Sequence, residues 1–78
     1  MKPVFGFLQG DTIGLLILAE TDMTMADITA RLQRMAQARV PIAAGYHVFF
    51  HGKQLADELT LAESGIQPLD RIDVRATL

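Results

Sequence analysis

The chain begins with a short apolar run that has the composition of a β-strand, and its two aromatic residues stand at alternate positions. Residues 4–8 place Phe5 and Phe7 on one face and their neighbours on the other. Residues 9–11 predict a turn, because glycine tolerates positive φ and an aspartate can accept a hydrogen bond from the backbone ahead of it. Residues 12–19 resume the strand pattern. The opening of the chain therefore predicts a β-hairpin.

A helix start follows the hairpin. Thr24 and Asp27 have the spacing of a capping box, in which Thr24 accepts a backbone N–H and Asp27 reaches back to the cap. Met23 and Ile28 stand at the two positions of a hydrophobic staple. Two independent signals therefore place the start of a helix at Thr24.

Beyond this start, apolar residues recur at helical spacing and predict one amphipathic helix. We expect it to end near Arg39, because the residue before a proline disfavours the helical conformation and Pro41 has no N–H to donate. The expected inward stripe is Ile28, Leu32, Met35 and Ala36, and the expected outward positions are Arg31, Arg34 and Gln37.

The second half of the chain predicts shorter elements. Residues 46–50 begin a third strand, Gly52-Lys53 forms a tight turn into a short strand, and residues 61–64 form a one-turn helical corner closed by Gly65. A final strand runs from residue 71 to residue 75. The order ββαββ closes naturally as a mixed sheet over one face of a single helix.

The motifs of this second half resemble known families. Phe50-x-Gly-Lys-Gln-Leu, followed by Thr60-Leu61 and Ile66, resembles ubiquitin, and Gly10-x-Thr12-Ile13 matches the first ubiquitin turn. Ala62-Glu63-Ser64-Gly65-Ile66-x-Pro68, followed by Ile72-Asp73-Val74, more specifically resembles the small B-type subunit of bacterial toluene monooxygenases, the toluene-4-monooxygenase system protein B family.

The resemblance implies an α+β fold: a ubiquitin-like β-grasp with a mixed four- to five-stranded sheet packed on one helix, as a single domain over residues 1–78. Ubiquitin's pattern also implies a core. Its expected members are Val4, Ile13, Leu15, Ile17, Ile28, Leu32, Val48, Phe50, Leu55, Leu61, Ile66, Ile72 and Val74.

Composition narrows the possible partners. The 78 residues include no cysteine, which excludes disulfides and thiolate metal sites and makes a cytoplasmic location the default. A net charge of −2 without a basic stripe argues against nucleic acid. The apolar run that ends at Leu8 is too short for a signal peptide or a membrane span. A mean hydropathy of +0.25 is high for a small domain and indicates apolar surface reserved for a partner.

Groups that could carry chemistry are sparse. His47 and His51 would share one strand face but lie about 13 Å apart, too far to hold one metal ion. Ser64 lacks the first glycine of a nucleophile elbow and falls in a helical corner. We therefore expect no catalytic, cofactor-binding or metal-binding residue in this chain.

The end of the sequence departs from ubiquitin. Ubiquitin and the sulfur-carrier β-grasp proteins end in Gly-Gly, whereas residues 75–78 here are Arg75-Ala76-Thr77-Leu78. A Cβ at those positions crowds the backbone in an activating enzyme's narrow site. Conjugation and sulfur transfer are therefore disfavoured.

The face of the sheet that points away from the helix is the candidate binding surface. A solvated face should carry polar side chains, yet five of these positions are large and apolar. A register slip of one residue in either of the first two strands would exchange the faces. If the register holds, burying the five would contribute on the order of 5–10 kcal/mol before association costs. The outward positions are Phe5, Phe7, Gly14, Leu16, Leu18, His47, Phe49, His51, Asp73 and Arg75, and the candidate interface residues among them are Phe5, Phe7, Leu16, Leu18, His47, Phe49 and His51.

Two functions remain open. The resemblance implies a non-catalytic small subunit docked on the large hydroxylase subunit of a di-iron monooxygenase, with the di-iron centre in that partner and no cofactor here. The apolar residues make the outer face the expected docking surface. Phe49 matches the centre of ubiquitin's own binding patch. The alternative is a free-standing ubiquitin-like adaptor for an unrelated protein.

Overall fold

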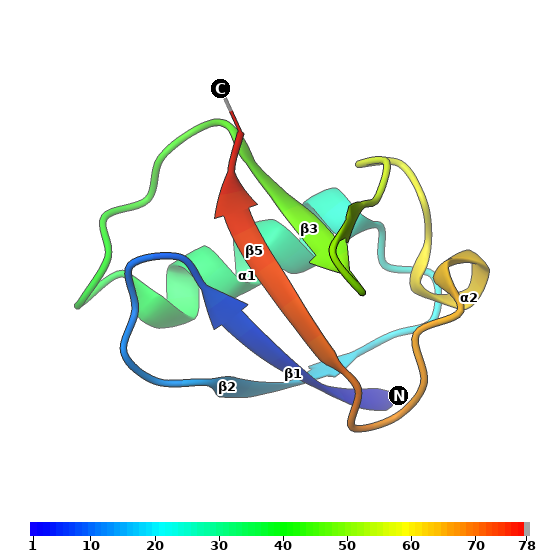
Figure 1. The fold of residues 1–78 in the computed structure, drawn as a ribbon. Coiled ribbons are helices and arrows are strands. Elements are labelled where there is room, and N and C mark those ends of the chain that lie inside the picture. Colours follow the sequence, from blue (N-terminus) through cyan, green and yellow to red (C-terminus); the bar gives the residue numbers. More distant parts are fainter. Residues whose placement is uncertain (78) are drawn as a thin grey trace.

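A mixed sheet covers one side of the main helix (Figure 1). The computed structural model describes residues 1–77. The five strands lie in the order β2-β1-β5-β3-β4, with β1 and β5 parallel and the other pairs antiparallel. The predicted α+β class and mixed sheet are confirmed. The elements are β1 (Lys2–Leu8), β2 (Leu15–Ala19), α1 (Met25–Ala36), β3 (Tyr46–Phe50), β4 (Lys53–Gln54), α2 (Leu61–Ser64) and β5 (Arg71–Ala76).

The register of β1 and β2 turns each side chain toward the face of the sheet that the sequence predicts. Val4 lies opposite Ile17, and both side chains are buried against α1. Phe5 lies opposite Leu16, and both side chains are exposed on the other face. A one-residue slip would reverse this arrangement, so the alternative register is excluded.

The second strand begins later than the sequence predicts. The Asp11 side chain accepts the Thr12 N–H at 2.8 Å, as the predicted turn requires. The residues that follow this turn do not yet pair with β1. Gly14 then lies against the Phe7 ring so closely that a Cβ would be 2.5 Å from Phe7 Cζ. Strand pairing starts only at Leu15, and the predicted burial of Ile13 is wrong, since it is 47% exposed.

Both predicted signals of the α1 start are consistent with the structure, and its capping box is complete. Thr24 Oγ1 accepts the Asp27 N–H at 3.1 Å, and Asp27 Oδ2 accepts the Thr24 N–H at 3.1 Å. The helix ends at Ala36 rather than near Arg39. The N–H groups of Arg39 and Val40 both donate to Ala36 O, so a turn follows the last helical residue.

The helix is rotated relative to the predicted stripe. Met35, expected inward, is 43% exposed, whereas Met25 is fully buried. Thr29 and Gln33 are also buried on this helix. The Gln33 side chain accepts the Ala43 N–H at 2.8 Å, so this side of α1 packs against the loop before β3. The stripe residues that are buried as predicted are Ile28, Leu32 and Ala36.

The turn after β3 lies one residue earlier than predicted. His51 and Gly52 have φ of 53° and 77°, and Phe50 pairs with Lys53, so this is a two-residue hairpin with positive φ at both turn positions. His51 therefore lies in the turn and not on the strand. The α2 corner is as predicted, with Gly65 closing it at φ 80°.

The core lies between the sheet and α1. Leu15, Phe50 and Leu55 are only partly buried against it. Within residues 1–77, neither helix is long and apolar enough to cross a membrane. The predicted core residues that are fully or almost fully buried are Val4, Ile17, Ile28, Leu32, Val48, Leu61, Ile66, Ile72 and Val74.

Candidate functional site on the outer face of the sheet

The β1–β2 half of the outer face is apolar and exposed. Phe5, Leu16 and Leu18 are 38%, 49% and 51% exposed, and Leu18 lies opposite Pro3 on the neighbouring strand. We call the surface formed by Phe5, Leu16, Leu18, Pro3 and the adjoining Leu69 the apolar patch. The structure thus brings three of the predicted interface residues together on one continuous surface.

Leu69 is a candidate surface residue that the sequence prediction missed. Its N–H donates to Pro3 O at 2.6 Å, which places it beside β1, and its side chain is 60% exposed. Its φ of 69° lies in the left-handed region, where a Cβ is unfavourable. A large apolar residue between Pro68 and Asp70, in a turn that suits glycine or asparagine, was the available signal.

The β1–β5–β3 part of the face is aromatic and charged. The Arg71 guanidinium lies 4.0 Å from the centroid of the Phe7 ring, and the Arg75 guanidinium lies 4.1 Å from that of Phe49. Asp73 stands between the two rings and accepts a hydrogen bond from Arg71 Nη2 at 3.0 Å. Phe7 and Phe49 are consequently half-buried by cations of their own chain.

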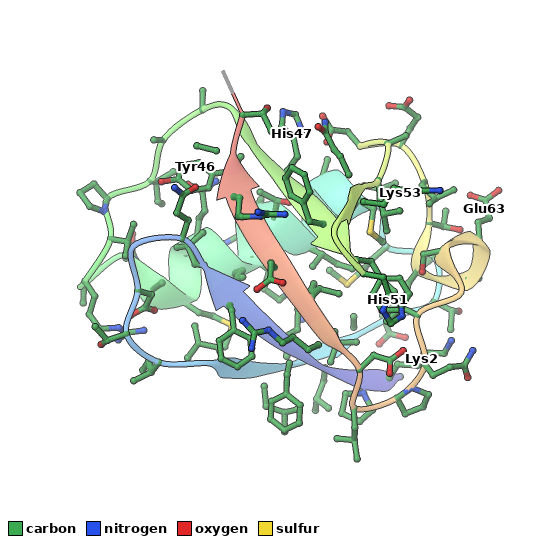
Figure 2. The ribbon with its side chains drawn as sticks, in the orientation of Figure 1. Lys2, Tyr46, His47, His51, Lys53 and Glu63 are labelled. Carbon is green, nitrogen blue, oxygen red and sulfur yellow. The ribbon has the colours of Figure 1, made fainter. Side chains whose placement is uncertain are left out.

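The two histidines occupy different surroundings. Figure 2 shows them at opposite ends of β3. His47 Nδ1 lies 2.8 Å from Asp57 Oδ1, which ties the strand to the loop before α2. The His51 ring packs on that of its neighbour Phe50, with centroids 4.0 Å apart. The structure therefore leaves His51 outside the surface formed by the other candidate residues.

The Ser64 hydroxyl has a structural role. Ser64 Oγ donates to Leu61 O at 2.7 Å and accepts the Ile66 N–H at 3.1 Å, so this hydroxyl holds the α2 corner. Across residues 1–77, no three His, Cys, Asp or Glu side chains converge as metal ligands would. The expected absence of a cofactor in this chain stays a prediction.

Comparison with known proteins identifies the family. The family model described as toluene-4-monooxygenase system protein B matches residues 1–75. The chain belongs to this family. The resemblance drawn from the motifs between Ala62 and Val74 is thereby confirmed. No curated protein matches the sequence.

Solved structures share the fold of this member of the toluene-4-monooxygenase system protein B family. A chain of a toluene 4-monooxygenase HD complex with the inhibitor 4-bromobenzoate has a TM-score of 0.89 and 22% identity, with 97% of this chain and 98% of that chain covered. Ubiquitin of Caldiarchaeum subterraneum has a TM-score of 0.82 and 14% identity, with 99% and 94% covered. These likenesses confirm the ubiquitin-like fold.

Proposed function

We propose that this chain is a non-catalytic small subunit of a multicomponent di-iron monooxygenase hydroxylase and docks on the large subunit through the outer face of its sheet. The match of the toluene-4-monooxygenase system protein B family over residues 1–75 carries this proposal. The solved chain with the same fold comes from a toluene 4-monooxygenase complex, which is consistent with such an assembly.

The apolar patch supports the docking surface. Exposed faces of antiparallel sheets normally carry polar side chains, but Phe5, Leu16 and Leu18 stand half-exposed side by side. Covering them removes apolar area from water at roughly 25 cal/mol per Å². Residues of this kind at the centre of an interface supply most of its binding energy. The patch is therefore the energetic centre of the proposed contact.

In this role the chain contributes assembly and stability rather than chemistry. The di-iron centre is assigned to the partner, and no residue of this chain is assigned to it. A large subunit that exposes its half of the contact would be prone to unfold or aggregate without the small one. The expected cytoplasmic location is consistent with a cysteine-free chain in such a complex.

The test is co-expression of a tagged chain with the subunits of a di-iron monooxygenase hydroxylase from the same organism. Leu18→Asp places an unpaired carboxylate in the patch and should lower recovery of the large subunit by at least about tenfold, because burying that charge costs several kcal/mol. The matched control is Ile42→Asp, in the loop between α1 and β3, where the native side chain is 56% exposed. Phe49→Asp is less decisive, because Arg75 lies over that site and can pair with the new carboxylate.

Recovery equal for wild type, Leu18→Asp and Ile42→Asp would place the interface elsewhere on the chain. Failure of the wild-type chain to recover any hydroxylase subunit would overturn the proposed function and favour the adaptor. Circular dichroism of each variant confirms that the comparison is made between folded chains.

A further inference from the structure

The two edges of the sheet differ in how they are protected. The β4 edge is two residues long and polar, which is a common way to prevent another strand from pairing. The β2 edge consists of Leu15–Ala19, five residues with no charge among them. Figure 1 shows β2 along the open margin of the sheet. This edge is open to pairing.

The hydrogen bonds identify which backbone groups of β2 are free. Pro3 O and the Phe5 N–H bond toward the β5 side, to Leu69 and Asp70. Because neighbouring residues of a strand bond in opposite directions, Val4 bonds toward β2 and engages Ile17. Leu16 and Leu18 must then direct their N–H and C=O groups off the edge. Leu18 O does accept a bond from outside the sheet.

That bond comes from α1. Arg31 Nη1 donates to Leu18 O at 3.0 Å, in an exposed position. Met35 follows Arg31 by four residues, so it lies one turn along on the same flank of the helix, next to the β2 edge. The 43% exposure of Met35 therefore falls beside an edge whose outer side chains, Leu16 and Leu18, are also exposed. A strand added here would find the apolar side chains of Leu16 and Leu18 on one face, and Met35 beside the charged Arg31 on the other.

We propose that β2 is extended in the assembled hydroxylase by a short, uncharged, extended segment of the large subunit, which pairs with the backbone of Leu16 and Leu18. This inference rests on the proposed function. The large subunit is the expected partner of the β2 edge because this edge is continuous with the apolar patch. Leu16 and Leu18 supply side chains to the patch and backbone groups to the edge. A partner seated on the patch lies directly beside the unpaired groups.

A second copy of this chain fits the edge less well. Antiparallel pairing of two β2 strands would require Arg31 to leave Leu18 O in both copies. It would also set two apolar patches side by side while leaving both facing water. Pairing with the large subunit displaces one Arg31 contact and covers the patch in the same step.

The experiment removes one N–H without changing a side chain. The 78-residue chain is within reach of chemical synthesis, so the Leu16 amide can be replaced by an ester with the leucine side chain retained. The matched control is an ester at Gln54. In the β3–β4 hairpin, Lys53 pairs with Phe50 and the Leu55 N–H donates to Val48 O, so both residues bond toward β3. Gln54 lies between them, and its N–H therefore points away from β3, off the β4 edge. Each synthetic chain is used to displace a fluorescent wild-type chain from the complex.

We expect the Leu16 ester to bind about 5-fold more weakly than wild type, the equivalent of one hydrogen bond of about 1 kcal/mol, and the Gln54 ester to bind as wild type. Hydrogen exchange read at single residues should show the Leu16 and Leu18 amides protected only in the complex. Unchanged binding of the Leu16 ester with unprotected amides would overturn the pairing while leaving the docking face intact. A β2-mediated dimer of the free chain would also overturn it. Failure of the wild-type chain to enter the complex would instead remove the proposed function.

Discussion

Thr24 and Thr60, the N-cap residues of α1 and α2, lie opposite each other in an isolated antiparallel bridge. Each carries its own capping box. Two backbone bonds cross between the segments, from the Met25 N–H to Leu59 O and from the Leu61 N–H to Met23 O, both at 2.8 Å. The starts of the two helices are therefore one structural unit.

Thr60→Ala should lower the free energy of unfolding by about 1 kcal/mol, because the Glu63 N–H loses its cap. Thr24→Ala should have a similar effect, and the double variant should depart from additivity by at least about 0.5 kcal/mol, since the two caps are in contact. Urea titration measures all three. Thr12→Ala, at an exposed loop position, is the control and should change stability by less than about 0.5 kcal/mol. Strict additivity would show that the two caps act separately.

A fork of two hydrogen bonds joins the first turn to the end of α1. Arg39 Nε and Nη2 donate to the two oxygens of Asp11 at 2.8 and 3.0 Å, and the Asp11 side chain is only 1% exposed. This bond to Arg39 holds the pKa of Asp11 below its usual range. The N–H of Thr60, donating to Glu63, likewise lowers the pKa of that carboxyl.

A carboxyl with a lowered pKa stabilises the folded chain above its unfolded pKa, and this contribution is lost as the pH falls. The urea midpoint should therefore drop as the pH is lowered below about 4, the ordinary range of these groups. Arg39→Gln should be less stable at neutral pH and should lose less on acidification, with the remaining slope due in part to Glu63. An unchanged pH slope in Arg39→Gln would contradict a role for the fork.

Leu32 and Met35 form a matched pair on one helix. Leu32 is fully buried and touches Gly6, where an added Cβ would lie 3.0 Å from its methyl groups, so β1 and α1 are closely packed. Leu32→Ala should lower the free energy of unfolding by about 2–5 kcal/mol by opening a cavity. Met35→Ala should cost less than about 1 kcal/mol in the same denaturant titration. Equal losses would mean that the helix is rotated from its position here.

Leu69 combines an unfavourable backbone conformation with an exposed apolar side chain, so replacing it separates the cost of the first from the role of the second in docking. Leu69→Gly should raise the free energy of unfolding by up to about 1 kcal/mol, because glycine adopts positive φ without strain. Leu16→Gly, in a strand, should lower it by a similar amount. Both variants should weaken co-purification with the hydroxylase. Full retention of binding by Leu69→Gly would show that the Leu69 side chain does not contribute to docking.

Local signals predicted the start of α1, the α2 corner and the faces of the first hairpin, because capping and alternation depend on neighbouring residues. The rotation of α1 was not predictable in the same way. Helical spacing defines a stripe but not its centre, which is set here by the distant contact of Gln33 with Ala43. The extension of the strand pattern through Ile13 was wrong for a similar reason, since the Phe7 ring occupies the space beside Gly14.

The candidate surface was predicted in part. Phe5, Leu16 and Leu18 were found because alternation alone determines which way they point. The partial cover over Phe7 and Phe49 depends on β5, which reaches the centre of the sheet from the far end of the sequence. Leu69 was not predicted because alternation gives no direction for a side chain in a turn, and its φ of 69° sets its direction here.

The guanidinium groups on Phe7 and Phe49 affect the newly made subunit before any partner arrives. A ring under a cation presents charge to water, so we expect the middle of the face to attract other copies of the chain less than bare rings would. Each ring contact contributes only about 0.5–1 kcal/mol at an exposed site. Arg71 also donates to Asp73, so Arg75 is the easier of the two for a partner to displace. We therefore expect these guanidinium groups to form a removable cover that shields the two aromatic rings from water until a partner displaces it.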